Sequence, residues 1–204
     1  MHLDYTSVIH FFFPPSEDEQ LLRNMTKESF AALSTNVQHA STRTLLPYND
    51  PHVKAAIHLN KYHYHRKAQI LLTHALTQYL HTLPTCDTYV VSIPLSSKRL
   101  RKRGYNQSDE VVRRTIKTMP HFHNVSKILK RTRDTKPQTT LTRKERLGNM
   151  HNAFTVSTRH AHIIQGAHIL LVDDVCTTGA TLKAAATALQ PYSPASVTCI
   201  ALAH

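Results

Sequence analysis

Short apolar runs alternate with stretches of helical spacing over most of this chain. The runs at 89–93 and 168–172 are mostly apolar, which is typical of strands buried on both faces of a parallel sheet. After each run, apolar side chains recur at helical spacing, at positions 111, 112, 115, 116 and 119 and at positions 182, 185, 186 and 189. Strands that alternate with helices predict an α/β fold with a parallel sheet and right-handed crossovers.

Further elements follow from capping and periodicity. Asn49-Asp50-Pro51 predicts a helix start, because a polar cap precedes a proline in the first turn. A second helix is expected over 66–82 and a strand over Val125–Leu129. Thr142 and Glu145 have the spacing of a capping box, which predicts a short helix after a flexible loop. The expected apolar face of the 66–82 helix consists of Ala68, Leu71, Leu72, Ala75, Leu76 and Tyr79.

The most informative segment runs from Ile169 to Leu182. Its apolar run ends in two adjacent carboxylates, Asp173 and Asp174, and a hydroxyl-rich loop with one glycine then leads into a helical pattern. In open α/β sheets ligands bind just beyond the carboxyl ends of the strands, so a ligand is expected at this loop. The acid pair would repel phosphate, and its natural partners are vicinal hydroxyls or a divalent cation.

The loop after the acid pair has the features of a phosphate cradle. Gly179 allows close backbone approach, and successive N–H groups at a helix N-terminus attract an anion. Carboxylates for a diol, beside amides for a phosphate, match a ribose 5-phosphate. The alternative is a polar strand-to-helix turn without a ligand. The candidate 5′-phosphate loop consists of Val175, Cys176, Thr177, Thr178, Gly179, Ala180 and Thr181.

Three ordered motifs carry a family resemblance. The first is Ile93-Pro94-Leu95-Ser96 running into Arg103-Gly104-Tyr105-Asn106-Gln107. The second runs from Lys130-Arg131-Thr132 through Pro137-Gln138 to Glu145-Arg146-Leu147-Gly148-Asn149 and Ala153-Phe154. The third, 169–182, resembles the phosphoribosyl pyrophosphate (PRPP) signature of type I phosphoribosyltransferases. Together the motifs resemble the ComF family, the competence-associated branch of that superfamily, over residues 47–204.

The resemblance implies a parallel-sheet type I phosphoribosyltransferase (Rossmann-like) core with a small N-terminal extension or hood. It also implies a glycosyltransferase that binds Mg²⁺ with PRPP and transfers ribose 5-phosphate to a nucleobase-like acceptor. Asp173 and Asp174 would then be the catalytic pair that holds the ribose hydroxyls and stabilises positive charge on the sugar ring. Magnesium would accompany the diphosphate, and no metal ligand is assigned to the protein.

Further site residues follow from the first two motifs. The first loop of the superfamily embraces pyrophosphate, which arginine can bind with two parallel hydrogen bonds. Asn106 and Gln107 remain open between ligand contact and helix capping. The Arg131–Gln138 region corresponds in order to the mobile loop that closes over such sites and excludes water. The candidate pyrophosphate ligands are Ser96, Lys98, Arg99 and Arg103. The candidates on or after the mobile loop are Lys136, Gln138 and Arg146, the last of which also fits an exposed helix charge.

Positive charge is concentrated between Lys98 and Arg146. This segment holds 16 of the 25 Lys and Arg residues against four acids, so it carries +12, the whole formal net charge. Such a region implies an anionic partner (pyrophosphate, a nucleotide or a nucleic acid) or a solvated face that maintains solubility.

Two other functions stay open beside group transfer. One is a PRPP or nucleotide sensor without turnover. The other, which the ComF resemblance implies, is a single-stranded DNA handling factor in natural transformation, with competence proteins as partners. For DNA, the aromatic residues of the basic segment that could stack on bases are Tyr105 and Phe122.

Cysteine usage predicts a cytoplasmic protein. Cys86, Cys176 and Cys199 are scattered and odd in number, which argues against a disulfide framework and for a reducing compartment. Cys176 is interpreted as a packing residue, because no histidine partner is evident. No apolar segment is long enough to cross a bilayer, and Phe11–Pro15 lacks the basic leader of a secretion signal.

The chain is expected to consist of an N-terminal extension, 1–46, and a phosphoribosyltransferase-like domain, 47–204. ComF-like proteins often carry a cysteine zinc ribbon in the first part, but no C-x-x-C pair is present here, so no zinc site is expected. Acceptor selectivity is expected from a hood built by the extension and the last residues. The 16 histidines are expected on the surface. The sequence determines neither the acceptor nor the oligomeric state.

Overall fold

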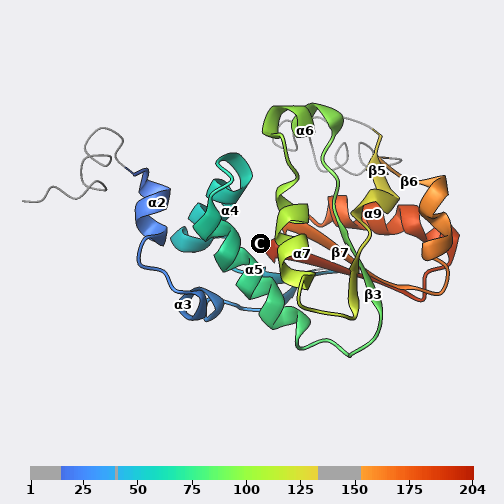
Figure 1. Cartoon of the computed structure of the whole chain (residues 1–204), viewed down its shortest axis with the longest axis horizontal. Helices are drawn as coiled ribbons and strands as arrows, with labels where there is room; N and C mark the ends of the chain where they lie inside the picture. The colour runs from blue at the N-terminus through green and yellow to red at the C-terminus, as the bar shows by residue number, and fades with distance from the viewer. Residues whose placement is uncertain (1–14, 40, 133–152) are drawn as a thin grey trace, which may run out of the picture.

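A mostly parallel six-stranded sheet forms the centre of the molecule (Figure 1). The computed structural model describes residues 15–39, 41–132 and 153–204. The strand order is β1-β2-β8-β7-β3-β4, and each neighbouring pair is parallel apart from β1 and β2. The predicted α/β fold with a parallel sheet is therefore confirmed. The strands are β1 (Val37–His39), β2 (Thr42–Leu46), β3 (Thr88–Ser92), β4 (Phe122–Asn124), β7 (His168–Val175) and β8 (Ser196–Ala203).

Helices cover both faces of this sheet. On one face lie α4, α5 and α7, and on the other lies α9 together with a two-stranded antiparallel ribbon, β5–β6 (Figure 1). The longer helices are α4 (Pro51–Tyr62), α5 (Arg66–Leu80), α7 (Gln107–Ile116) and α9 (Ala180–Leu189). The shorter elements are α2 (Glu17–Leu22), α3 (Lys27–Ala31), α6 (Ser97–Arg103), β5 (Leu129–Arg131), β6 (Phe154–Val156), and the 3₁₀ turns η1 (Ser126–Ile128), η3 (Thr158–Ile163) and η4 (Gln190–Tyr192).

Strand β7 shows why the apolar runs are unbroken. Leu170 and Val172 pack in the core shared with α4, α5 and α7, whereas Ile169 and Leu171 pack in the core shared with α9. All four side chains are at most 2% exposed. Since successive strand residues point to opposite faces, burial of both faces requires apolar side chains at every position.

Most of the expected helix boundaries are confirmed. The Asp50 side chain accepts hydrogen bonds from the N–H groups of His52 and Val53, so α4 begins with the cap and proline that the sequence predicts. Helix α5 covers 66–80, and its predicted apolar face is buried. The Thr142–Glu145 helix lies outside the described residues.

The strand predicted over Val125–Leu129 is wrong. Ser126–Ile128 form a 3₁₀ turn instead, and the chain is extended on either side of it, in β4 and β5. The Asn124 side chain accepts a hydrogen bond from the Ser126 N–H at 2.9 Å, a local contact that competes with strand pairing. The apolar run therefore contains a bend that periodicity alone does not reveal.

The parallel strands end along one edge of the sheet. Asp173 pairs with Ala201 and Val175 with Ala203, so the last residues of β7 and β8 lie side by side. The neighbouring strand β2 also runs parallel to β8, and β3 runs parallel to β7. The division of the chain at residue 46 stays a prediction. In the described part of the chain, no helix is both long and apolar enough to cross a membrane.

Candidate functional site

A cavity of about 640 Å³ lies at the carboxyl edge of the sheet. This volume is in the range of small-molecule and cofactor sites. The cavity brings together the acid pair, the whole predicted 5′-phosphate loop and two of the four predicted pyrophosphate ligands. Its lining residues are Tyr48, Lys61, Ile93, Leu95, Arg99, Arg103, Gln107, Arg131, 173–182 and His204.

The two carboxylates of the pair have different surroundings. Asp174 is 6% exposed, and its Oδ2 lies 3.1 Å from Lys61 Nζ and accepts a hydrogen bond from Gln107 Nε2 at 2.8 Å. Its Oδ1 accepts a hydrogen bond from the Val175 N–H at 2.8 Å. Asp173 Oδ1 accepts one from the Asp174 N–H at 2.9 Å, and no ion pair among the described residues involves Asp173.

These surroundings shift the acidity of the two groups in opposite directions. Burial, and then the charge of Asp174, raise the pKa of Asp173 to about 7. Burial alone would also raise the pKa of Asp174, but the Lys61 charge and the Gln107 hydrogen bond outweigh burial and lower it. At neutral pH the pair therefore holds one firmly ionised carboxylate and one that is about half protonated.

The loop after β7 forms the turn expected from its glycine. Gly179 has φ +71°, a left-handed conformation that other residues rarely adopt, and α9 begins at the next residue. The N-cap Gly179 has no side chain to cap α9, and Thr178 Oγ1 accepts a hydrogen bond from the Ala180 N–H at 3.4 Å, so the next N–H groups of the first turn have no side-chain cap in the described part of the chain. Together with Thr177, Thr178 and Thr181 this end of α9 provides donors for a phosphate.

Cys176 lies in this loop as a packing residue. Its side chain is 4% exposed and belongs to the core that α9 covers. Burial raises the pKa of the Cys176 thiol, which keeps it protonated at neutral pH and therefore a poor nucleophile.

Helix α6 positions the candidate pyrophosphate ligands. Ser96 is its N-cap, is 3% exposed and accepts a hydrogen bond from the Arg99 N–H at 3.4 Å. Arg99 and Arg103 line the cavity, but Lys98 is exposed and does not. The structure thus brings the two arginines to the acid pair, whereas Ser96 lies in the helix start and Lys98 on the outside.

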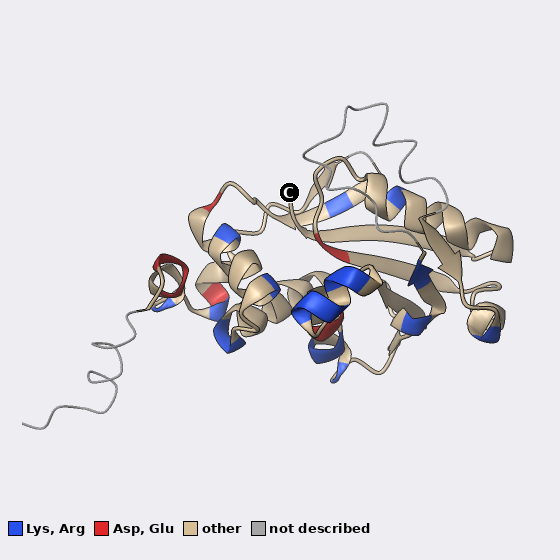
Figure 2. Cartoon of the chain, turned by 90° about the horizontal axis from the view of Figure 1, so that it is seen from above, with Lys and Arg blue, Asp and Glu red and all other residues tan. Residues whose placement is uncertain are grey.

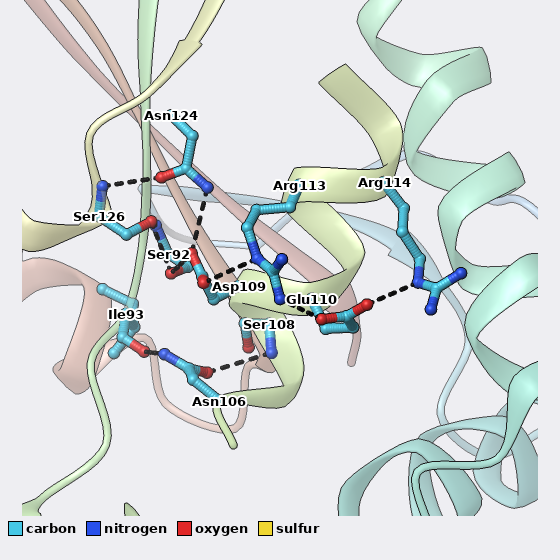
Figure 3. A network of polar contacts seen from close by, with 10 residues as sticks. All are labelled: Ser92, Ile93, Asn106, Ser108, Asp109, Glu110, Arg113, Arg114, Asn124 and Ser126. Carbon is cyan, nitrogen blue, oxygen red and sulfur yellow. Dashed lines mark hydrogen bonds and ion pairs between the residues drawn. The ribbon is translucent and has the colours of Figure 1, made fainter. Parts of the chain in front are cut away.

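A polar network holds the loop between β3 and α7 in place (Figure 3). Asn106, the N-cap of α7, donates to the Ile93 carbonyl at 3.0 Å and accepts from the Ser108 N–H at 3.2 Å. Asp109 accepts from Ser92 Oγ at 3.1 Å and from Asn124 Nδ2 at 3.2 Å, which joins α7 to β3 and β4. Asn106 therefore caps a helix, which was one of its two open roles.

Gln107 does not cap the helix, and it lines the cavity, so ligand contact stays a prediction for this residue. Its amide contacts Asp174, and its Oε1 accepts a hydrogen bond from Arg103 Nη1 at 3.0 Å. Gln107 therefore links the arginine side of the cavity to the acid pair.

The ribbon β5–β6 brings Arg131 to the cavity. Arg131 pairs with Phe154 across the ribbon, and its guanidinium lies 5.4 Å from the centre of the Phe154 ring. The Thr132 N–H donates to the Ala153 carbonyl at 2.9 Å, so these two residues lie side by side. The candidates Lys136, Gln138 and Arg146 lie outside the described residues.

Three lining residues escaped the sequence analysis: Lys61, Tyr48 and His204. The Tyr48 N–H donates to the His204 carbonyl at 2.7 Å, so these two residues, far apart in sequence, share one wall. His204 Nδ1 lies 2.7 Å from the Cys176 carbonyl, which requires a proton on Nδ1. Tyr48 could have been found from the sequence, because it lies just after a strand, where ligands bind. Nothing in the sequence around Lys61 indicated that it would line the cavity.

Charge on this side of the molecule is strongly positive. Figure 2 views the chain from the side on which α6 lies in Figure 1, and blue segments gather on this helix. A red stretch lies nearby at the end of a central strand, where β7 ends. No described residues form a group of three or more His, Cys, Asp or Glu that could hold a metal ion.

The aromatic residues near α6 differ from those expected to stack on bases. The Tyr105 hydroxyl bonds to the Asn60 carbonyl and the Tyr64 N–H, and Phe122 packs against the core. Tyr62 and Tyr64 are instead 56% and 47% exposed.

Comparison with known proteins identifies the family of this chain. Residues 99–204 match the family model described as "Phosphoribosyl transferase domain". The DNA utilization protein YhgH of Escherichia coli (strain K12) is 36% identical over 108 residues, 53% of this chain and 45% of that protein. The DNA utilization protein YhgH of Salmonella typhi is 35% identical over 134 residues, 64% of this chain and 55% of that protein.

A third relative is the Competence protein F of Haemophilus influenzae, 34% identical over 94 residues, 46% of this chain and 40% of that protein. The chain spans about half the length of the curated relatives that it matches. No solved structure matches it.

Proposed function

This chain belongs to the phosphoribosyl transferase domain family, and we propose that it binds PRPP with Mg²⁺ and transfers ribose 5-phosphate to a nucleobase-like acceptor. One observation carries the proposal. The cavity at the carboxyl edge holds an acid pair, the N-terminus of α9 and two arginines from α6 around one space. Each group suits a different part of PRPP: the diol, the 5′-phosphate and the diphosphate.

The chemistry divides between these groups. The 175–181 loop binds the 5′-phosphate, and this remote binding energy positions the anomeric carbon. The acid pair binds the ribose hydroxyls and stabilises cationic charge on the ring. Arg99 and Arg103 stabilise the departing pyrophosphate. Magnesium supplied with PRPP would neutralise the diphosphate charge.

The acceptor side of the proposed reaction is the wall formed by Tyr48 and His204. The contact with the Cys176 carbonyl places a proton on His204 Nδ1, and in the neutral imidazole the lone pair is then on Nε2. The His39 ring packs on this imidazole at 3.8 Å between centroids, which fixes its plane. A planar acceptor with a ring N–H fits such a wall, since Nε2 can accept that proton.

Calorimetric titration with Mg²⁺ and PRPP tests the donor site. Wild type should release heat, and Asp173→Asn combined with Asp174→Asn should lose most of it. Pyrophosphate release on addition of nucleobases then tests turnover. Equal heats from both proteins would refute the site, and PRPP binding without release for any base would favour the sensor.

A second candidate function is handling of single-stranded DNA. It is supported by the basic helix α6 beside the exposed Tyr62 and Tyr64, since base stacking on aromatics and phosphate contacts to basic side chains are the usual means of binding single strands. The names of the relatives, which refer to DNA utilization and competence, also favour it. DNA binding that weakens steeply with salt, together with no PRPP affinity, would favour this function over transfer.

Cytoplasmic location stays part of the proposal. Cys86, Cys176 and Cys199 are free thiols, and Cys176 and Cys199 are buried, as suits a reducing compartment.

A further inference from the structure

Helix α4 carries Lys61 to the acid pair from outside the matched 99–204 region. The last turn of α4 is attached to the loop before α7: the Asn60 carbonyl accepts a hydrogen bond from the Tyr105 hydroxyl, and Asn60 Nδ2 lies 3.5 Å from the Gln107 carbonyl. Asn60 is fully buried. The backbone at Lys61 is therefore fixed beside Gln107, and both side chains reach the same oxygen, Asp174 Oδ2.

The donors leave the two acids with unequal capacity to bind a ligand. Asp174 accepts from Lys61 and Gln107 on one oxygen and from the Val175 N–H on the other. Asp173 accepts only one backbone hydrogen bond within the described part of the chain. A carboxylate has about four acceptor positions, so Asp173 keeps most of its positions available and Asp174 keeps few.

Charge compensation favours the same division. Two neighbouring carboxylates at a poorly hydrated site cannot both be ionised without a nearby cation. Lys61 lies 3.1 Å from Asp174, with 25% of its side chain exposed, and its ammonium group compensates the more buried acid. Asp173 lines the cavity and forms no ion pair with another described residue, although the charges of Lys61 and Arg131 act on it from a distance.

We infer that Lys61 is a positioning residue that holds Asp174 in a structural role, so that Asp173 is the acid of the pair that binds the ribose diol. The ligand in this inference rests on the proposed function. The Lys61–Asp174 ion pair does not depend on the proposed function, because it is present in the ligand-free chain.

A double-mutant cycle tests the inference on the full chain with Mg²⁺ and PRPP as the probe. Lys61→Met should weaken PRPP binding about tenfold or more, because it leaves a buried charge uncompensated. Asp174→Asn should do the same, because it leaves Lys61 unpaired. The variant that combines Lys61→Met with Asp174→Asn should regain affinity to within about threefold of wild type. Asp173→Asn should lose PRPP binding, both in wild type and when it is added to that double variant. If the double variant binds no better than the single variants, Asp174 itself grips the ligand and the inference is wrong.

Two controls separate positioning from folding. Lys61→Arg keeps the cation and should preserve binding, and Lys54→Met removes an exposed lysine of the same helix and should change nothing. The melting temperature of ligand-free protein should fall by about 5 °C in each single variant and recover in the double variant.

Failure of the proposed function gives a different result. If wild type binds no PRPP, the proposed function fails. The melting temperatures then test by themselves whether Lys61 and Asp174 stabilise each other. Additive losses of stability in the double variant would then refute the pairing.

Discussion

Asp173 should destabilise the ligand-free protein at neutral and alkaline pH. Its pKa is raised to about 7 by burial and by the charge of Asp174, against an ordinary value of 3.8. The folded chain therefore holds this proton more tightly than the unfolded chain does between about pH 4 and pH 7. Over that window stability falls as the pH rises, and above pH 7 the loss is complete.

The magnitude follows from the same difference. A pKa of about 7 against 3.8 corresponds to about 4 kcal/mol at most. Asp173 is partly exposed, and water screens its charge, so we expect about 2 kcal/mol. Asp173→Asn removes the charge and keeps an oxygen for the Asp174 N–H. The variant should be about 2 kcal/mol more stable than wild type at pH 8 and equal to it at pH 4.

Urea unfolding followed by circular dichroism between pH 4 and pH 8 measures this difference. In melting temperature the gain at pH 8 should be about 5 °C for a chain of this length. Asp174→Asn is the matched control and should lose stability, because Lys61 then lacks its partner. Parallel pH curves for wild type and Asp173→Asn would refute the reasoning, since they would show that Asp173 titrates normally.

Three further predictions concern the cavity. Gly179→Ala should lower the free energy of unfolding in urea by about 1 kcal/mol and weaken PRPP binding in calorimetry, because a side chain is strained at φ +71°. Unchanged values for both would show that the turn tolerates a Cβ. Arg99→Ala should raise the Kd for PRPP about tenfold, while Lys98→Ala should leave it unchanged because Lys98 does not line the cavity. Equal effects of the two variants would show that the total positive charge of α6, and not Arg99 itself, attracts PRPP. His204→Ala should raise the KM of the acceptor about tenfold in a pyrophosphate-release assay and leave PRPP affinity unchanged. A loss of PRPP affinity would instead show that His204 contacts PRPP and not the acceptor.

Local sequence signals account for most of the fold. Asp50 before Pro51 fixed the start of α4, and Gly179 fixed the turn into α9, because capping and positive φ are properties of a few adjacent residues. Helix α6 was not expected, although Ser96 and Gly104 frame it as cap and left-handed terminator. The bend at Ser126 had no comparable signal, because apolar periodicity does not distinguish a strand from a strand interrupted by a 3₁₀ turn.

The sequence by itself determined the chemistry around Asp173 and the 175–181 loop, since both lie in one continuous strand-turn-helix segment whose groups are neighbours in the chain. The tertiary structure decided what stands opposite them. Lys61 comes from α4, Gln107 from α7, and His204 follows the last residue of β8, and these elements meet only because the strands end at a common edge. Which acid receives the cation is therefore a property of packing: it depends on where Asn60 attaches the end of α4, over a separation of more than one hundred residues from the acid pair.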